Sequence, residues 1–377
     1  MARPDPARDD DVRLSVAGVG LACSLGLGAV DACAAAFAGL SRPAPMPGVD
    51  VYDPEEAEGV DLAVHAAPFV TEGFAGVARL ARLAVAALDD LAARVDLPDD
   101  GKTGICVALP SGYHLRRLEQ EEAAADPDPP PTPYALEADV RVGELRERLV
   151  PTIRRFSDVP LHPSPGVTLF EDEAGFGALL RTADRALRGG ALRRCLVGGV
   201  DSPLDPATIR ARDHAGVLFT PENAGGAAPG EAAAFVLVER AADGADGLTI
   251  SGVAQGREVP FVRGADARPA GVALARCLSA TRAAAPVEVG TVYTSLNGAA
   301  HRAFDWGSAL VRLEAEAPFA PEAVHPATMV GDVGAATGPV AVALADHARQ
   351  RGWGPRASAV WLASDAGPRA SFRLTSP

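Results

Sequence analysis

The sequence is short of lysine and of positive charge in general. Lys102 is the only lysine among 377 residues, and every other basic residue is arginine. Acidic residues outnumber basic ones by 49 to 35, which gives a formal net charge of −14. Because an acidic protein repels phosphate backbones and anionic lipid headgroups, we expect neither a nucleic acid nor a membrane surface as a partner.

Paired cysteines are also missing. The five cysteines are scattered, and no two of them form a C-x-x-C pair: Cys23, Cys33, Cys106, Cys195 and Cys277. This pattern argues against a disulfide framework and against a zinc site, so no metal and no cofactor is predicted. Unpaired thiols suit a reducing compartment, and we expect a cytoplasmic protein.

One apolar stretch, residues 14–40, has about the length of a membrane span. Three aspartates at positions 9–11 precede it, where a signal peptide carries positive charge, and four glycines interrupt it between residues 18 and 28. The stretch is therefore predicted to be a buried strand, a turn and a buried helix.

The remaining sequence is globular, with 48% hydrophobic and 22% charged residues. Apolar strand patterns alternate with helical patterns, which predicts an α/β protein with largely parallel, buried sheets. Strands are expected at 13–21, 102–109, 167–170, 195–200, 230–239, 248–253, 287–294, 360–363 and 371–374. Helices are expected at 29–40, 76–95, 140–149, 176–188, 270–281, 306–314 and 340–350. Residues 41–65 are expected to be an irregular surface insertion, and residues 119–139 a surface excursion that is not a core element.

The strand and helix series starts twice, which predicts two similar halves joined near residue 243. The first half is expected to span residues 11–243 and the second half residues 244–377.

Three groups of motifs resemble the β-ketoacyl synthases in their order and spacing. The first is Val16 to Gly20 followed by Ser24-Leu25-Gly26. The second group runs from Cys195 to Ser202 and then through Leu218 to Asn223 and Pro229-Gly230-Glu231. The third is Val330-Gly331-Asp332-Val333-Gly334-Ala335-Ala336-Thr337-Gly338, which is similar to the family's G-H-x-x-G-A-A-G loop.

The resemblance implies the thiolase-like fold, five layers α-β-α-β-α from two duplicated halves, usually dimeric. It also implies a pocket for an acyl thioester where the halves meet. Family members carry a cysteine nucleophile at a strand-to-helix elbow, two histidines, and a lysine shortly before the second histidine.

None of these four catalytic side chains is present at the matching position. The nucleophile position falls at Glu173, and no cysteine, serine or threonine lies between Leu169 and Leu180. The histidine positions fall at Asn297 and Asp332, and the lysine position falls at Ala327. Asp305 matches the acid that follows the family's first histidine motif, which supports this register.

These substitutions oppose condensation chemistry. A carboxylate is a poor acyl acceptor because the mixed anhydride is high in energy. Asn297 could still donate a hydrogen bond to an oxyanion, whereas Asp332 would repel a developing enolate. Some family members with glutamine in place of the cysteine are decarboxylases or inactive partners of an active synthase, and those decarboxylases keep their histidines. The inactive partner is the better comparison.

Three hypotheses follow. The chain could bind an acyl group, an acyl carrier protein or a partner synthase subunit without condensing activity, as a homodimer or a heterodimer. It could be an acyltransferase-type enzyme with a rewired pocket of Glu173, Asn297 and Asp332. It could also be a scaffold in a biosynthetic or secretion assembly, with its pocket filled. An open cavity shared by the three candidates would favour the first two.

Several local expectations accompany these hypotheses. Glu173 should begin a largely buried helix, and Glu231 should be a buried structural carboxylate. His301 and His325 are expected to be surface or capping residues that could approach the pocket. Ser295 and Cys106 are candidates for a displaced nucleophile. The strand near 191–200 is expected to be the edge that pairs across a twofold axis.

Overall fold

The computed structural model describes residues 12–125, 137–242 and 247–377, and its dominant feature is one large mixed sheet. The strand order along the sheet is β11-β10-β12-β13-β9-β1-β8-β7-β5-β6, with the short strand β2 (Gly26–Leu27) paired to β1. The strands of one half are β1 (Arg13–Cys23), β8 (Ala232–Arg240), β7 (Arg194–Asp201), β5 (Thr103–Ala108) and β6 (Val167–Leu169). Those of the other half are β9 (Thr249–Arg257), β13 (Pro368–Thr375), β12 (Ala357–Ala363), β10 (Thr291–Tyr293) and β11 (Glu322–Val324).

The two halves of the sheet repeat one pairing pattern. Along β1-β8-β7-β5-β6 the pairs are antiparallel, antiparallel, parallel and parallel, and the same sequence of pairs runs along β9-β13-β12-β10-β11. The halves join where the first three residues of β1 pair with β9. The expected junction near residue 243 falls at residues 243–246, which lie outside the described residues, so the domain boundary remains a prediction.

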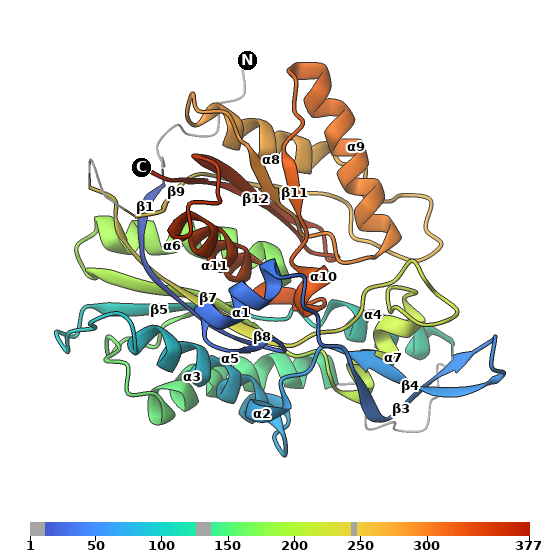
Figure 1. Cartoon of the computed structure of the whole chain (residues 1–377). Helices are drawn as coiled ribbons and strands as arrows, with labels where there is room; N and C mark the ends of the chain where they lie inside the picture. The colour runs from blue at the N-terminus through green and yellow to red at the C-terminus, as the bar shows by residue number, and fades with distance from the viewer. Residues whose placement is uncertain (1–11, 126–136, 243–246) are drawn as a thin grey trace.

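The two halves of the sheet enclose one layer of helices, and further helices cover the outer face of each half (Figure 1). This is the α-β-α-β-α order that the family resemblance implied. The central helices α6 (Gly175–Arg188) and α11 (Thr337–Gln350) contact strands of both halves. Outside them, α3 (Gly76–Ala92) and α5 (Glu137–Phe156) cover the first half, and α8 (Val272–Ala283) and α9 (Ala300–Glu316) cover the second. The remaining helical segments are α1 (Ala29–Phe37), α2 (Pro68–Thr71), α4 (Tyr113–Ala125), α7 (Pro206–His214), α10 (Ala327–Val330), and the 3-10 turns η1 (Asp172–Ala174) and η2 (Gly334–Ala336).

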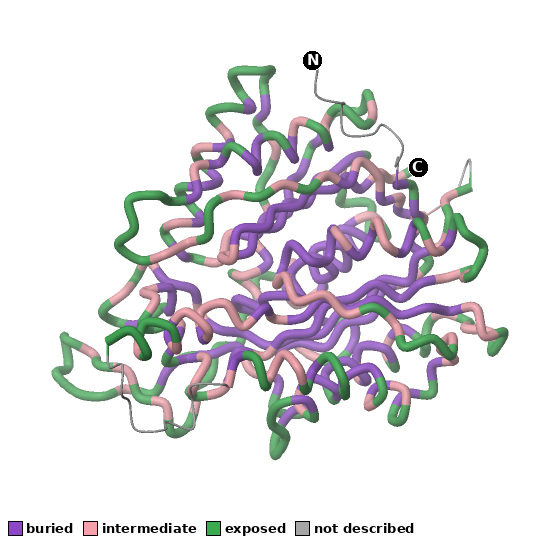
Figure 2. The backbone as a smooth tube through the Cα atoms, turned by 180° about the vertical axis from the view of Figure 1, so that it is seen from behind, coloured by how far each residue is buried: buried purple, intermediate pink, exposed green. Residues whose placement is uncertain are grey.

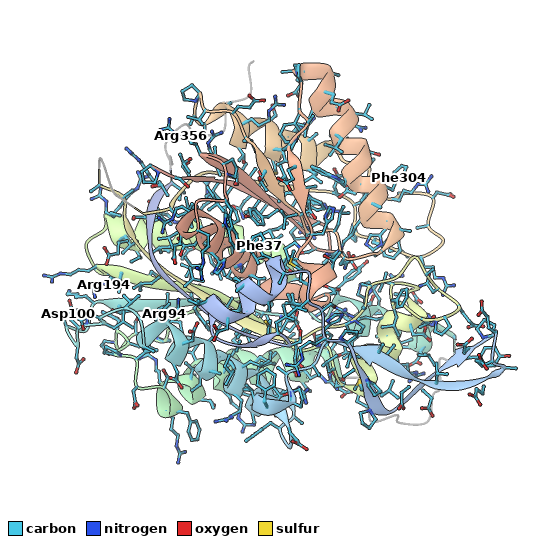
Figure 3. All side chains as sticks on the ribbon, in the orientation of Figure 1. Phe37, Arg94, Asp100, Arg194, Phe304 and Arg356 are labelled. Atoms are coloured by element: carbon cyan, nitrogen blue, oxygen red, sulfur yellow. The ribbon has the colours of Figure 1, made fainter. Side chains whose placement is uncertain are left out.

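The central helices α6 and α11 can lie between the two halves of the sheet because small residues let the backbones approach closely. A Cβ at Gly177 of α6 would lie 2.6 Å from the Ala370 side chain of β13, and one at Gly338 of α11 would lie 2.7 Å from Phe176. Figure 2 shows the result, with the central helices and the strands around them coloured as buried. On one flank α1 closes the layer, where Phe37 (labelled in Figure 3) stacks on His347 of α11 at a ring distance of 6.0 Å.

The membrane alternative for residues 14–40 is replaced by β1, β2 and α1, as the glycine pattern predicted. Among the residues that the structure describes, no helix combines the length and the apolar character needed to cross a bilayer.

One expectation about the surface segments was wrong. Residues 41–65 are mostly an antiparallel hairpin of β3 (Ala44–Asp53) and β4 (Glu58–Val64), not irregular chain. The hairpin packs only a small apolar cluster against the body, so its sequence lacks a strong alternation. The segment 119–139 is helical at both described ends, where α4 and α5 reach into it, and residues 126–136 lie outside the described residues.

The expected edge strand was also wrong. The strand that covers residues 191–200 is β7, and it lies between β8 and β5 with hydrogen bonds on both sides. Its continuous apolar run reflects burial on both faces, which is typical of an interior strand. The outermost strand of this half in the described sheet is β6 (Val167–Leu169), where Val167 keeps 40% of its surface exposed.

Candidate functional site

Glu173 lies at a strained elbow between β6 and α6. The preceding residue, Asp172, has a φ angle of +50°, a left-handed conformation that costs energy for a residue with a side chain. Ser111 holds this turn, because its backbone N–H and its hydroxyl each donate to the Asp172 carboxylate at 2.7 Å. Glu173 follows with only 2% of its surface exposed, in the 3-10 turn η1 and two residues before α6 begins, so its predicted placement at the start of a buried helix is confirmed.

The Glu173 carboxylate is held by a buried arginine. Arg302, in the first turn of α9, donates from Nη1 to Oε1 of Glu173 at 2.6 Å, and its side chain is 6% exposed. The same Nη1 donates to the carbonyl and hydroxyl oxygens of Ser295 at 3.2 and 3.3 Å. Its Nε donates to Asp365 Oδ1 at 3.1 Å. The guanidinium group is therefore fixed in orientation, and it neutralises charge at the position where the family has its nucleophile.

A second ion pair lies at Asp332, the position that the motif resemblance assigns to the family's second histidine. Asp332 Oδ2 accepts from Arg212 Nη1 at 3.0 Å and from Asn297 Nδ2 at 3.1 Å, while Oδ1 accepts from the Gly334 N–H at 3.3 Å. Arg212 comes from α7, and Asn297 lies just before α9. Asn297 and Asp332, which the resemblance assigns to the family's two histidines, are thus hydrogen-bonded to each other, and Arg212 holds the Asp332 carboxylate.

Two further aspartates complete the polar cluster. Asp201, at the end of β7, accepts from the Ala335 N–H at 3.0 Å. This contact depends on a close approach, since a Cβ at Gly199 would lie 1.9 Å from the Ala335 carbonyl oxygen. Asp365 accepts from His301 Nε2 and His114 Nε2, each at 2.8 Å; a carboxylate can only accept, so both ring nitrogens carry the proton.

Burial and neighbouring charges shift the pKa values of these carboxyl groups in different directions. Desolvation raises the pKa of Glu173 to about 8, against the lowering effect of Arg302, and Asp332 and Asp172 add to the rise. Desolvation likewise raises the pKa of Asp201 to about 7. Although burial opposes it, the guanidinium groups of Arg212 and Arg302 hold the pKa of Asp332 below its ordinary value. Near neutral pH the cluster therefore carries fewer negative charges than its count of carboxyl groups suggests.

The polar cluster lines one cavity of about 550 Å³. Glu173, Asn297 and Asp332 all lie on its wall, so the three candidates from the sequence converge on a common space. Most of the apolar wall comes from α3, α4 and α5, with Leu80 and Leu145 among its side chains. A volume of this size suits a small organic ligand. Such a cavity is what the two binding hypotheses require.

The other candidates from the sequence lie at the margin of this site. His301 faces inward to Asp365 and stacks on Phe261 with ring centroids 3.8 Å apart, whereas His325 is half-buried and meets Thr294 Oγ1 at 2.7 Å. Ser295 is 2% exposed, and its hydroxyl accepts from Arg302 and from the Ala363 N–H.

The remaining positions supply no nucleophile or ammonium group at the cavity. Cys106 is buried in β5, with its sulfur 3.6 Å from that of Cys195. Ala327 begins α10, and Lys102 precedes β5. Within the described part of the chain, no group of three or more histidine, cysteine or carboxylate side chains could hold a metal ion.

Sequence reasoning missed the residues that neutralise the site. Arg302 and Arg212 belong to no family motif, and their partners lie 129 and 120 residues away in the chain. Asp201, Asp365 and His114 were likewise not named as site residues. The one available signal was the placement of Asp201 at the last position of β7 and of Asp365 two residues after the end of β12.

The raised pKa values predict how the stability of the protein depends on pH. Glu173 and Asp201 bind protons more tightly in the folded than in the unfolded chain, so their contribution is largest at low pH. The free energy of unfolding should fall as pH rises from about 4 through 8. Urea titrations at pH 5, 7 and 9 would measure this trend, and D201N should show a shallower decline. An equal decline in the variant would contradict the assignment to Asp201.

Comparisons with known proteins agree on the fold. No protein-family model matches the chain, and no curated protein sequence matches it. The ishigamide ketosynthase/chain length factor structure superposes with a TM-score of 0.67 at 18% identity, covering 96% of this chain and 99% of that one. A complex of a type II polyketide synthase acyl-carrier protein with its ketosynthase bound to the hexaketide (AntDE:AntF) gives 0.69 at 15% identity, with 98% and 100% covered.

A third structure is the ketosynthase ApeO in complex with its chain length factor ApeC from Xenorhabdus doucetiae. It superposes with a TM-score of 0.66 at 14% identity and covers 97% of this chain and 98% of that one. The chain therefore has the ketosynthase fold of the thiolase-like type over nearly all of its described residues, which confirms the fold predicted from the motifs.

Proposed function

We propose that this chain, whose fold is that of the ketosynthases, is a non-condensing member of a synthase assembly that binds a ligand in its cavity and pairs with a second subunit. One observation carries the proposal. The nucleophile position holds a buried carboxylate in an ion pair with Arg302, beside an open cavity. A chain adapted only as a scaffold has no need of such a cavity.

The polar cluster lacks the free nucleophile and the free donor groups that condensation requires. An acyl group needs a nucleophile, and Glu173 is both a poor acceptor and engaged with Arg302. An enolate needs free cationic or donor groups. Asn297 Nδ2 already donates to Asp332, and the guanidinium groups of Arg212 and Arg302 are paired with carboxylates. Binding without acyl transfer is the activity that remains.

Pairing is proposed to use the outer edge of β6. This strand offers unpaired backbone groups at the side of the sheet away from β5, and such an edge invites a strand from a second molecule. The ketosynthase–chain length factor complexes among the similar structures suggest a homologous active synthase as the partner, and a second copy of this chain is the alternative. An acyl carrier protein is a further candidate, since a ketosynthase–carrier complex is also among them.

Sedimentation tests the association. The wild-type chain alone, or mixed with an active synthase subunit, should form dimers at micromolar concentration. V167D places a charge on the β6 edge and should weaken association about tenfold or more, because an unpaired charge in an interface is costly. V311D is the matched control, since Val311 is 70% exposed on α9, away from this edge. A wild-type monomer under both conditions would contradict the proposed role.

A further inference from the structure

The outer face of α1 exposes apolar side chains. Val30, Ala34 and Phe37 recur at the spacing of one helical face, and none of the three is fully buried. After the helix, the Leu40 N–H donates to the Ala35 carbonyl at 3.0 Å, which brings Leu40 back beside this face with 56% of its surface exposed. In Figure 1 α1 lies on the near side of the molecule with no element in front of it.

A tryptophan extends this face. Trp353 follows α11 and keeps 62% of its surface exposed, whereas the other two tryptophans are buried. Its ring meets that of Phe37 edge-on at 5.9 Å, and Phe37 stacks on the buried His347. Because these contacts already hold the rings, a partner would cost them little side-chain entropy. Val30, Phe37, Leu40 and Trp353 are called the α1 patch below.

Three charged side chains frame the α1 patch. Asp31 lies at its N-terminal end, in the first turn of α1. Arg42 and Arg351 flank the opposite end, each two residues from a member of the patch. All three are exposed, and within the described part of the chain their side chains make no hydrogen bond and no ion pair. Negative charge therefore lies at one end of the patch and positive charge at the other.

This order of charges makes the patch complementary to itself. A twofold axis places α1 antiparallel to the same helix of a second copy, so each end of the patch meets the opposite end. With Ala34 opposite Phe37, Asp31 comes opposite Leu40 and so lies close to Arg42 of the other copy. The small side chain at position 34 would let the helix axes approach to about 8–10 Å. A partner surface of one charge sign would match only one end of the patch.

We infer that the outer face of α1 is a contact between two copies of this chain, with the twofold axis crossing the helix between Ala34 and Phe37. The inference goes beyond the proposed pairing at β6. Three strands, β8, β7 and β5, separate β6 from β1, on which α1 packs, so one contact leaves the other surface accessible.

The size of the contact indicates a weak association. A helix of nine residues is about 14 Å long, so the contact is smaller than a standard interface of about 800 Å² per partner. We expect it to link molecules at high concentration, after any tighter pairing at β6 has formed.

Sedimentation equilibrium of V167D isolates the α1 contact, because this substitution blocks the β6 edge. V167D should still dimerise, with a Kd of roughly 10–100 µM. Adding W353S should raise the Kd at least about tenfold, since tryptophans are frequent hot spots of interfaces. V311S is the matched control, because it removes an exposed apolar side chain from α9 and should leave the Kd of V167D unchanged.

Charge reversal tests the twofold arrangement. D31R in the V167D background should raise the Kd about three- to tenfold, because like charges then meet twice across the axis. D31R/R42E/R351E reverses both ends of the patch and should restore the Kd to within about threefold of that of V167D. Only a contact between copies gains from reversing both ends in the same chain. Circular dichroism checks that each variant is folded, and W353S decides if D31R is not.

Three results would each overturn the inference: V167D that stays monomeric at about 500 µM, W353S that associates as well as its parent, or a triple reversal that associates no better than D31R. The β6 edge is blocked in all of these variants. Failure of the α1 contact is therefore distinguishable from failure of the pairing in the proposed function.

Discussion

Incubation with octanoyl-N-acetylcysteamine, a simple acyl thioester, should leave the mass of the intact chain unchanged. The reason is that no cysteine lines the cavity among the described residues, and the candidate nucleophiles are already engaged. Glu173 is paired with Arg302, and the hydroxyl of Ser295 already accepts two hydrogen bonds. Removal of a nucleophile together with its supporting groups abolishes a mechanism that acts as a unit, so condensation should fall below detection. Intact-mass spectrometry and an assay for β-ketoacyl product measure the two outcomes.

The matched variants are E173C and E173A. E173C places a thiol two residues before α6, where a helix N-terminus lowers the pKa of a thiol and favours acylation. It should gain one acyl group but should not condense, since Asn297 and Asp332 supply no imidazole. E173A should remain unmodified. A stable adduct on the wild-type chain, lost when Ser295 or Cys106 is replaced, would contradict the proposed function and restore the enzyme hypothesis.

Replacement of Glu231 by alanine should lower the free energy of unfolding by about 3–5 kcal/mol, as expected when one partner of a buried ion pair is removed. Glu231 is fully buried. Its Oε1 accepts from the Ala67 N–H at 2.7 Å, the Thr71 hydroxyl at 2.8 Å and Arg79 Nη2 at 3.0 Å. Its Oε2 accepts from Arg79 Nε at 2.7 Å and the Ser202 hydroxyl at 2.8 Å. Alanine would leave these buried donors unsatisfied.

Guanidinium chloride unfolding followed by circular dichroism gives the measurement, and E239A is the control. Glu239 lies eight residues further along, in β8, with its side chain 41% exposed, and it pairs with Arg194 at 2.8 Å. A surface ion pair contributes about 0–1 kcal/mol, so E239A should stay close to the wild type. If E231A is no less stable than E239A, the carboxylate is not the structural hub described above.

The sequence was informative where function follows from local pattern. Apolar strands that alternate with helices predicted the layers, and short motifs placed Glu173, Asn297 and Asp332, which do line one cavity. Glu231 was expected to be a buried structural carboxylate, and it is.

The sequence was silent where a contact joins distant segments. The pairing of Arg302 with Glu173 cannot be recognised from hydrophobic periodicity, because the two residues come from different layers of the fold. The edge strand was misplaced for a related reason. Apolar residues on both faces of β7 report burial, but they do not say which strands lie on either side.

The strand β1 has a consequence for how the chain is made. It leaves the ribosome well before β8 and β9, which begin more than 200 residues later in the chain. At a synthesis rate of about 5–20 residues per second, this apolar strand waits on the order of 10–40 s before its hydrogen bonds to β8 and β9 can form. Closing so long a loop is slow, and during that delay β1 presents an unpaired edge to its surroundings. Production of the folded protein should therefore depend on chaperones more than its native stability alone would suggest.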